Sequence, residues 1–288
     1  MVNFKLKEPS FYKEIDIKTR NTIGSNNLYT NYTELSGTKK KLSYLASFNF
    51  KSGDGFRPNS EFNSRNYFFQ LNYKLNDQTN IKTEFTFLDY LAQQGGGLSD
   101  SMFNENPFQS NRSRNWFNIN WLLFQTKIKH SFSDNSKLDI QLFGLNAQRD
   151  ALGYRTNRVS AVDPNSYRDL ISGKFKNYGI ETKWLNELNI FGKKIILLLG
   201  GKWYSTQNTS NQGPGSTGNG PDFEFYTFEN PNYSYQSNYS YPNKNLALFS
   251  EQIFYLNKKI SISPGVRYEY INTCLLYTSD AADERSSV

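Results

Sequence analysis

The chain has 288 residues, of which 16% are aromatic and 20% are charged, and its formal net charge is +7. The low mean hydropathy, with no apolar run longer than residues 195–199, excludes a membrane-spanning helix, which needs about 20 consecutive apolar residues. One cysteine and one histidine exclude a disulfide scaffold, a cysteine-based zinc site and a histidine metal cluster, and they disfavour serine–histidine catalysis.

The positive charge does not indicate a nucleic-acid-binding protein. Lysines gather at expected turns, as in residues 39–41, 193–194 and 258–259, or alternate along expected strands. No Lys/Arg stripe gathers on one element and no nucleic-acid motif is present. The 20 Tyr and 23 Phe residues, together with 35 Asn residues, instead suit half-buried strands joined by turns.

Alternation of apolar and polar residues is the main structural signal of the chain. Residues 41–51, 67–76, 178–190 and 259–271 place aromatic and aliphatic side chains on one face of a strand and polar ones on the other. We expect about eleven strands, over residues 13–22, 28–35, 41–51, 66–76, 80–90, 115–132, 136–149, 176–190, 194–207, 246–256 and 259–272. The apolar phase slips near Leu123 and Phe124, which predicts a β-bulge at that point.

The expected connections alternate between short and long from the third strand onward. Short turns fall at residues 35–40, 76–80, 133–136, 191–194 and 257–258, whereas long links cover residues 52–65, 91–114, 150–175 and 208–245. This is the layout of an outer-membrane barrel, which has short periplasmic turns and longer extracellular loops. Most of the expected strands are also long enough to cross a bilayer.

We therefore predict an all-β fold, a transmembrane antiparallel β-barrel that lies in the outer membrane in contact with its lipid. Charged residues such as Lys82 and Glu84 on the polar face suit a wet lumen better than a dry core. A soluble β-sandwich is the alternative, and the asymmetry of the loops argues against it.

Both ends of the sequence depart from this pattern. Residues 1–7 carry charges where a signal peptide has its apolar region, so the protein is either cytosolic or begins at another point. From Cys274 to Glu284 the alternation stops, and the string CLLYTSDAADE resembles the translation of a transposase adapter used to prepare DNA libraries. We expect residues 274–288 to be a non-native, adapter-derived tail.

Three blocks of the chain carry a family resemblance. They are residues 2–7 (VNFKLK), residues 96–112 (from GGLS to QSNR) and residues 260–269 (ISISPGVRYE). In turn they resemble the end of the N-terminal plug, the third long extracellular segment and a recurrent barrel strand of the TonB-dependent outer-membrane receptors. The resemblance is closest to the ferric dicitrate receptor branch of that family.

The resemblance implies a barrel of about 22 strands around a plug, so that eleven strands are about half of it. Residues 1–12 are then the remnant of the plug-to-barrel junction, and residues 13–273 are the N-terminal half of the barrel. It further implies a monomeric receptor without a cofactor, which imports a ferric chelate when the TonB–ExbB–ExbD complex acts on the missing plug. A half-barrel leaves two unpaired edges in lipid, so we expect that the isolated chain neither folds stably nor transports.

The sequence contains no catalytic constellation, and we predict that the protein is not an enzyme. Glycines 95–97 lack the Lys-Ser/Thr that completes a phosphate-binding loop, and residues 213–221 (GPGSTGNGP) read as a low-complexity loop. The chemically useful groups are instead the cationic and aromatic side chains of the long loops.

Arginines are the expected ligands of an anionic chelate, because the guanidinium group binds carboxylates in a bidentate way. By the resemblance, Arg112 of QSNR matches an arginine of the family's QSxR segment. Other arginines of the dicitrate branch align here with Asp100, Pro107 and Trp116, which departs from a citrate site. We predict that the substrate-binding residues, each with a solvated loop arginine as the alternative interpretation, are Arg112, Arg114, Arg155, Arg158 and Arg168.

The longest loop is rich in aromatic residues, which leave the chemical class of the ligand open. These aromatics can stack on a catecholate or aryl siderophore, or they can pack the loop onto itself or lie at the membrane interface. They are Phe223, Phe225, Tyr226, Phe228, Tyr233, Tyr235, Tyr239 and Tyr241. Two further alternatives are a receptor of the same fold for another nutrient, such as cobalamin or an oligosaccharide, and a passive porin-like barrel.

Overall fold

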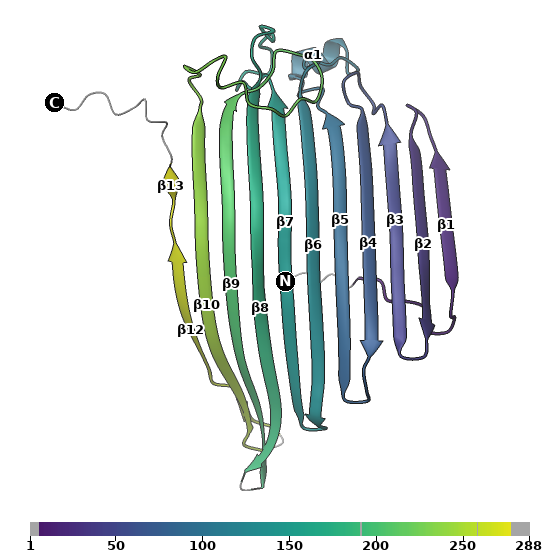
Figure 1. Cartoon of the computed structure of the whole chain (residues 1–288), viewed down its shortest axis with the longest axis vertical. Helices are drawn as coiled ribbons and strands as arrows, with labels where there is room; N and C mark the ends of the chain where they lie inside the picture. Colours follow the sequence, from purple (N-terminus) through teal and green to yellow (C-terminus); the bar gives the residue numbers. More distant parts are fainter. Residues whose placement is uncertain (1–5, 191, 258, 278–288) are drawn as a thin grey trace, which may run out of the picture.

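One antiparallel sheet accounts for most of the structure, a computed structural model that describes residues 6–190, 192–257 and 259–277 (Figure 1). The strands are Asp16–Ile23 (β1), Tyr29–Lys39 (β2), Leu42–Gly53 (β3), Phe62–Lys74 (β4), Thr79–Gln93 (β5), Trp116–Ser133 (β6), Ser136–Gly153 (β7), Asp169–Ile190 (β8), Lys193–Pro214 (β9), Ser237–Tyr255 (β10), Ser261–Ile262 (β11), Gly265–Thr273 (β12) and Leu276–Tyr277 (β13). A six-residue helix, Asp100–Glu105 (α1), lies in a long loop. No helix in the described ranges is long and apolar enough to cross a membrane.

The strands pair in chain order from β1 to β10, each antiparallel to the next. β10 then pairs with β11, β12 and β13, which together form one interrupted eleventh row. The expectation of about eleven strands is therefore confirmed, with the last strand broken into three segments. β13 falls in the tail that we expect to be non-native, and residues 278–288 of that tail lie outside the described residues.

Three strands reach well beyond the limits that alternation predicted, toward the long loops, whereas β4, β5 and β7 exceed theirs by only three or four residues. β8 begins at Asp169, β9 ends at Pro214 and β10 begins at Ser237, each several residues beyond the expected limit. The stretches added to β9 and β10 are rich in Asn, Ser, Thr and Gln and lack an apolar period, whereas the stretch added to β8 reads DLISGKF. All three pair in continuous register. Backbone hydrogen bonding between long neighbouring strands extends β9 and β10 without help from a hydrophobic face.

The sheet has one face lined by exposed aromatic and aliphatic side chains, which we call the outer face. Tyr67, Phe87 and Leu122 are cross-strand neighbours on this face, and all three are exposed. The Tyr67 ring lies 4.8 Å from the Phe48 ring and 6.0 Å from the Phe87 ring. Such a continuous apolar surface is what a barrel presents to lipid.

The opposite, inner face is polar along the same rows. Gln70, Glu84 and Gln125 are cross-strand neighbours there, and the Gln125 amide hydrogen-bonds to the Glu84 carboxylate. Lys82 forms an ion pair with Glu84 at 3.0 Å. Charged groups of this kind keep their partners on the face that a barrel turns toward its lumen.

The expected bulge at Leu123 and Phe124 is absent. The pairing of β6 with both neighbours runs without interruption through these residues, and the register shifts only between Ser131 and Ser133. The phase slip has another physical cause, because the apolar face changes within the strand. Toward the turns β6 is apolar on the outer face, as at Phe124, whereas toward the long loops it is apolar on the inner face, as at Ile119.

The connections differ at the two ends of the sheet, as the sequence predicted (Figure 1). Tight turns join the strand pairs at one end, and at one of them Lys40 adopts a positive φ of 55°. The other end carries longer loops, one of which contains α1. These loops are residues 54–61, 94–115, 154–168 and 215–236.

The segment before β1 runs across the inner face of the sheet. Lys7 Nζ lies 2.7 and 2.6 Å from the two carboxylate oxygens of Glu34 on β2. Glu8 accepts hydrogen bonds from Lys82 at 2.9 Å and from Gln70 at 3.0 Å. Ion pairs with β2 and β5 therefore fix the chain against the polar wall.

Candidate functional site

Three of the long loops contact one another at the end of the sheet; they are residues 94–115, 154–168 and 215–236 (Figure 1). The Asn111 side-chain amide donates to the Val159 carbonyl at 2.7 Å, which joins the first loop to the second. The indole N–H of Trp116, where β6 begins, donates to the Asn219 carbonyl at 2.7 Å. Loop 94–115 and the start of β6 therefore contact both loop 154–168 and loop 215–236.

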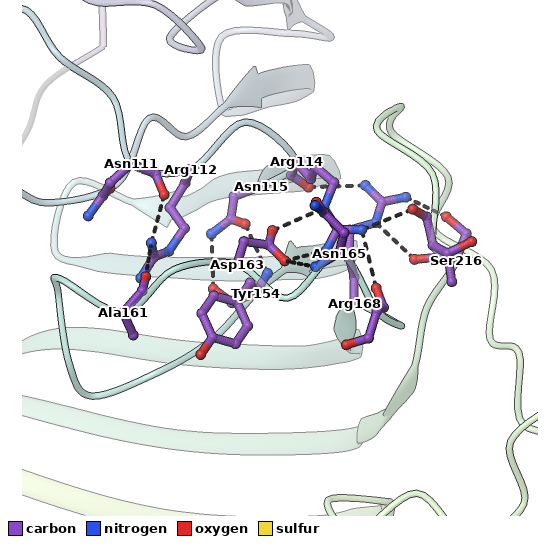
Figure 2. Close-up of polar contacts among 12 residues, drawn as sticks. Asn111, Arg112, Arg114, Asn115, Tyr154, Ala161, Asp163, Asn165, Arg168 and Ser216 are labelled. Carbon is purple, nitrogen blue, oxygen red and sulfur yellow. Dashed lines mark hydrogen bonds and ion pairs between the residues drawn. The ribbon is translucent and has the colours of Figure 1, made fainter.

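Arg168 connects these loops from a fully buried position (Figure 2). Its Nε donates to the Ser216 carbonyl at 3.1 Å, and its Nη1 donates to the carbonyls of Arg114 at 3.0 Å and Gly220 at 2.8 Å. Its Nη2 hydrogen-bonds to the Ser216 hydroxyl. A buried guanidinium group is costly unless its donors are used, and here four hydrogen bonds use them.

Arg114 forms the ion pair of this network. The residue is 2% exposed, and its Nε and Nη2 lie 3.0 and 2.5 Å from the two carboxylate oxygens of Asp163. Its Nη1 donates to the carbonyls of Ser166 at 3.2 Å and Thr217 at 2.9 Å. The two parallel bonds to Asp163 have the fork geometry that makes arginine–carboxylate pairs strong and directional.

The ion pair also changes the acidity of Asp163. Burial alone raises the pKa of this carboxyl group, but hydrogen bonds from Arg114 and from the backbone N–H of Asn165 outweigh it, so the pKa lies below its usual value. Asp163 is thus a carboxylate at neutral pH, and it neutralises a cation that the loops bury.

Arg112 is the third buried arginine, at 6% exposure. Its Nη1 donates to the carbonyl of Asn111 at 2.7 Å and to that of Ala161 at 3.0 Å. Its guanidinium carbon lies 5.1 Å from the centre of the Tyr154 ring, a cation–π contact. Figure 2 shows this residue in the same loop cluster as Arg114.

Arg155 and Arg158 differ from these three because both are exposed. Arg155 Nη1 lies 3.1 Å from an Asp169 carboxylate oxygen, with half of its side chain open to solvent. The Arg158 side chain has no hydrogen bond or ion pair to another residue in the described part of the chain. The structure therefore divides the five predicted arginines into three that join loops and two whose guanidinium groups are accessible.

Asp169 is a site residue that the sequence analysis missed. It accepts hydrogen bonds from Arg155, from the Gln212 amide at 3.0 Å and from the Tyr233 hydroxyl at 3.1 Å. Burial, the Asp169 charge and this hydrogen bond together raise the pKa of Tyr233. Asp163 was missed as well; only its place before Pro164, a turn signal, marks it in the sequence.

The aromatic residues of the longest loop fall into two groups. Tyr239 and Tyr241 lie in β10, and Tyr226 donates its hydroxyl to Asp222 at 2.9 Å, so these side chains serve the fold. Phe228 and Tyr235 are strongly exposed.

A second exposed aromatic feature was not predicted. Phe56 and Phe108, from two different loops, pack with ring centres 4.9 Å apart while both remain more than half exposed. Among the described residues, no group of three or more His, Cys, Asp or Glu side chains is arranged to hold a metal ion.

Comparison with solved structures identifies the architecture. The chain is similar to the ferric citrate transporter FecA in its unliganded form, with a TM-score of 0.72, 15% identity, and coverage of 91% of this chain and 38% of that chain. It is similar to the receptor in the FpvAI–pyocin S2 complex, with a TM-score of 0.71, 14% identity and coverage of 95% and 40%. It is also similar to the open form of the ferric-catecholate import receptor Fiu from E. coli K12, with a TM-score of 0.67, 10% identity, and coverage of 98% of this chain and 48% of that chain.

The sheet therefore has the fold of part of the β-barrel of a TonB-dependent receptor, which confirms the predicted fold class. The chain spans less than half the length of each of these solved receptors. The sequence matches no protein-family model, and it matches no curated protein.

Proposed function

We propose that this chain forms part of the barrel of an outer-membrane receptor for the TonB-dependent uptake of a ferric chelate. The observation that carries the proposal is the sidedness of the sheet, with an exposed apolar outer face, a charged inner face and long loops at one end only. The solved structures with this fold are named as ferric citrate, ferric-catecholate and ferripyoverdine receptors, which favours a ferric chelate over cobalamin, an oligosaccharide or passive diffusion.

The protein acts by binding and transport, without covalent chemistry. Residues 1–12 are the junction to a plug and residues 13–273 are barrel, as the resemblance implies. The contacts of Lys7 and Glu8 with the inner face support this division, because they direct the chain before β1 into the space that a plug fills. The TonB–ExbB–ExbD complex acts on that plug, and residues 274–288 belong to neither part.

The five arginines take two roles in chelate binding. Arg155 and Arg158 contact the anionic chelate, because their guanidinium groups are exposed to solvent at the loop end of the sheet. Arg112, Arg114 and Arg168 fix the loops that present them, because their donors are already used. A carboxylate-rich chelate suits exposed arginines, which bind such groups in bidentate geometry.

Uptake of radioactive iron tests the transport function. The uninterrupted gene that contains this chain is expressed in a Gram-negative host lacking its own chelate receptors, and ⁵⁵Fe accumulation is measured with ferric citrate and with a ferric catecholate. Uptake that requires both TonB and the proton gradient supports the receptor. Uptake that persists without TonB supports a passive barrel and contradicts the proposal.

A double variant tests the accessible arginines. Arg155→Ala with Arg158→Ala should weaken chelate binding by about 100-fold or more, because each charge-assisted contact contributes about 1.5–3 kcal/mol and two such contacts are lost. Arg20→Ala is the matched control, since Arg20 is an exposed arginine on β1, far in sequence from the long loops. Unchanged binding in the double variant would remove Arg155 and Arg158 from the site.

A second candidate ligand is an aryl chelate, favoured by one observation. The exposed Phe56–Phe108 pair offers aromatic surface at the loop end, where a catecholate ring can stack. Phe108→Ala should then reduce binding of a ferric catecholate and leave ferric citrate unaffected. If Phe108→Ala instead reduces binding of ferric citrate and leaves the ferric catecholate unaffected, the loops bind a citrate-type chelate.

A further inference from the structure

Three lysines on the outer face take no part in the loop network. Lys174 and Lys176 lie on β8 and Lys244 lies on β10, and all three are exposed. They share the face of Tyr178, because side chains two apart on a strand point the same way and Ser205 pairs with both Tyr178 and Lys244. This cluster is named the outer lysine patch.

The three side chains are close enough to bind one anionic group. Lys174 and Lys176 are separated by two strand positions, about 7 Å. β9 separates β8 from β10, and Lys176 is level with Pro242, two positions from Lys244. Lys244 therefore lies roughly 12 Å from Lys176 and roughly 16 Å from Lys174. Lysine has a flexible four-carbon stem, and its ammonium groups can converge over such distances.

Lys174 and Lys176 lie on the loop side of an aromatic band, and Lys244 lies level with it. Tyr178 is the next outer-face residue on the turn side of Lys176, and its ring centre lies 5.6 Å from that of Trp203. Leu246 pairs with Trp203 and is exposed beside it. Exposed tyrosine and tryptophan at the edge of an apolar surface mark the boundary between hydrocarbon and headgroups.

No protein carboxylate neutralises the patch in the described part of the chain. The cross-strand neighbours of Lys174 are Gln148 and Thr209, which are neutral. The carboxylate diagonal to Lys174, Asp150, is buried and accepts hydrogen bonds from the amides of Gln148 and Asn118. None of the three lysines forms an ion pair with another residue that the structure describes.

The inner face provides an internal comparison. Lys82 pairs with Glu84 and Glu8, and Lys183 pairs with Glu181. In these cases the chain supplies the counter-charge for a lysine on a strand. The outer lysine patch lacks such a carboxylate at the height where a bilayer presents its headgroups.

We infer that the outer lysine patch binds the phosphate groups of an anionic lipid in the outward-facing leaflet. The inference rests on the proposed function in one respect, that the outer face contacts a bilayer. Tyr178 and Trp203 lie against the acyl chains, and Lys174 and Lys176 contact the phosphates above them. Lys244, level with Tyr178, extends its four-carbon stem toward the same phosphates. The lipid is part of the protein's surroundings and does not enter the loop site.

Lipid retention tests the inference in the intact receptor that contains this chain. The receptor is placed in nanodiscs of neutral phosphatidylcholine with a small fraction of bisphosphorylated lipid A, released, and examined by native mass spectrometry for bound lipid. A lysine near an anionic surface contributes about fivefold to binding, so Lys174→Gln, Lys176→Gln and Lys244→Gln together should reduce retention about 100-fold. The matched control removes three inner-face lysines, with Lys127→Gln, Lys129→Gln and Lys137→Gln.

The outcomes distinguish lipid phosphate from free inorganic phosphate, and they distinguish a failure of this inference from a failure of the proposed transport function. Retention should survive in the Lys→Arg triple variant, fall with dephosphorylated lipid A, and resist an excess of inorganic phosphate. Equal retention in the Lys→Gln variant and the wild type, equal loss in the inner-face control, or displacement by inorganic phosphate overturns the inference. Chelate binding should be unchanged by the lysine substitutions, so a failure of the transport function is recognised independently by the iron-uptake assay.

Discussion

The loop end and the inner wall both bury charged side chains, but they satisfy them differently. At the loop end, Arg168 donates mainly to backbone carbonyls, and its partners come from two other loops. On the inner wall, Glu34 and Glu84 accept from lysines whose other side is open to solvent. The first arrangement depends on loop geometry, whereas the second depends on charge.

This difference determines what each region can do. A guanidinium group fixed by carbonyl oxygens is insensitive to salt, because its acceptors are neutral and buried. An ion pair with a half-exposed lysine weakens in salt and costs little to separate. The loop end is therefore built for a fixed shape, and the inner wall for a contact that can be released.

The largest expected effect is at the centre of the loop network. Arg168→Ala should destabilise the loop end by about 4 kcal/mol, because each buried acceptor left without a donor costs about 1–3 kcal/mol. Hydrogen exchange of residues 215–236 in the full-length protein that contains this chain measures the change. Arg158→Ala is the control and should stay within about 0.5 kcal/mol, since its side chain is exposed; equal effects would contradict the assignment of Arg168.

Removing the carboxylate of the same network should have a smaller effect. Asp163→Asn should cost about 2–3 kcal/mol, because Arg114 keeps two carbonyl acceptors while losing its buried counter-charge. The rate of proteolysis within residues 154–168 reports the loosening. A wild-type rate in this variant would show that the ion pair does not hold the loop.

The pH dependence of that ion pair follows from the lowered pKa of Asp163. The pair stabilises the folded loop fully above the ordinary carboxyl pKa of 3.8, and the contribution is lost as pH falls through the lower folded value. Proteolytic protection should therefore be constant from neutral pH down to about pH 5 and decline only in stronger acid. Asp163→Asn should lack this acid transition, and a transition near neutral pH would contradict the mechanism.

The inner-wall contact should give a smaller change still. Glu34→Gln removes the acceptor charge for Lys7, whose side chain is half exposed, so the expected cost is about 1 kcal/mol or less. A spin label near the N-terminal segment should become more mobile in this variant. Lys13→Gln, which removes a solvent-exposed partner of Asp16, is the matched control and should change nothing measurable.

Salt should separate the two regions most finely. Raising ionic strength from about 0.01 M to about 1 M shortens the screening length from about 30 Å to about 3 Å. The free energy of local opening around Lys7, measured by hydrogen exchange, should then fall by a few tenths of a kcal/mol. The value around Arg168 should not change. Equal salt sensitivity at both places would remove the distinction between them.

The strands were predictable because a period of two is a local property of the sequence. Alternation located every row of the sheet, including one that is broken into β11, β12 and β13. It failed at Leu123 and Phe124, where both faces of β6 are apolar at the same height. A bulge and a change of apolar face give the same local pattern, and only the pairing with β5 and β7 distinguishes them.

The roles of the arginines could not be predicted in the same way. Arg114 meets Asp163 and Thr217, which are 49 and 103 residues away, so no local pattern links them. In the sequence, Arg168 and Arg158 look alike, since each is an arginine in a polar loop. In the structure Arg168 is buried and Arg158 is exposed. Their difference arises only when three loops close on one another.

In the proposed outer-membrane receptor, the change of apolar face along β6 also fixes how deeply the barrel lies in the bilayer. The hydrocarbon of the bilayer contacts the outer-face residues of β6. Its edge lies where the apolar side chains change from the outer face to the inner face of the strand. Adding two residues on the turn side of Phe124 would lift the loops by one repeat, about 7 Å, with every side chain still facing correctly. Adding a single residue would reverse inside and outside for the rest of the strand, so evolution can adjust immersion only in even steps.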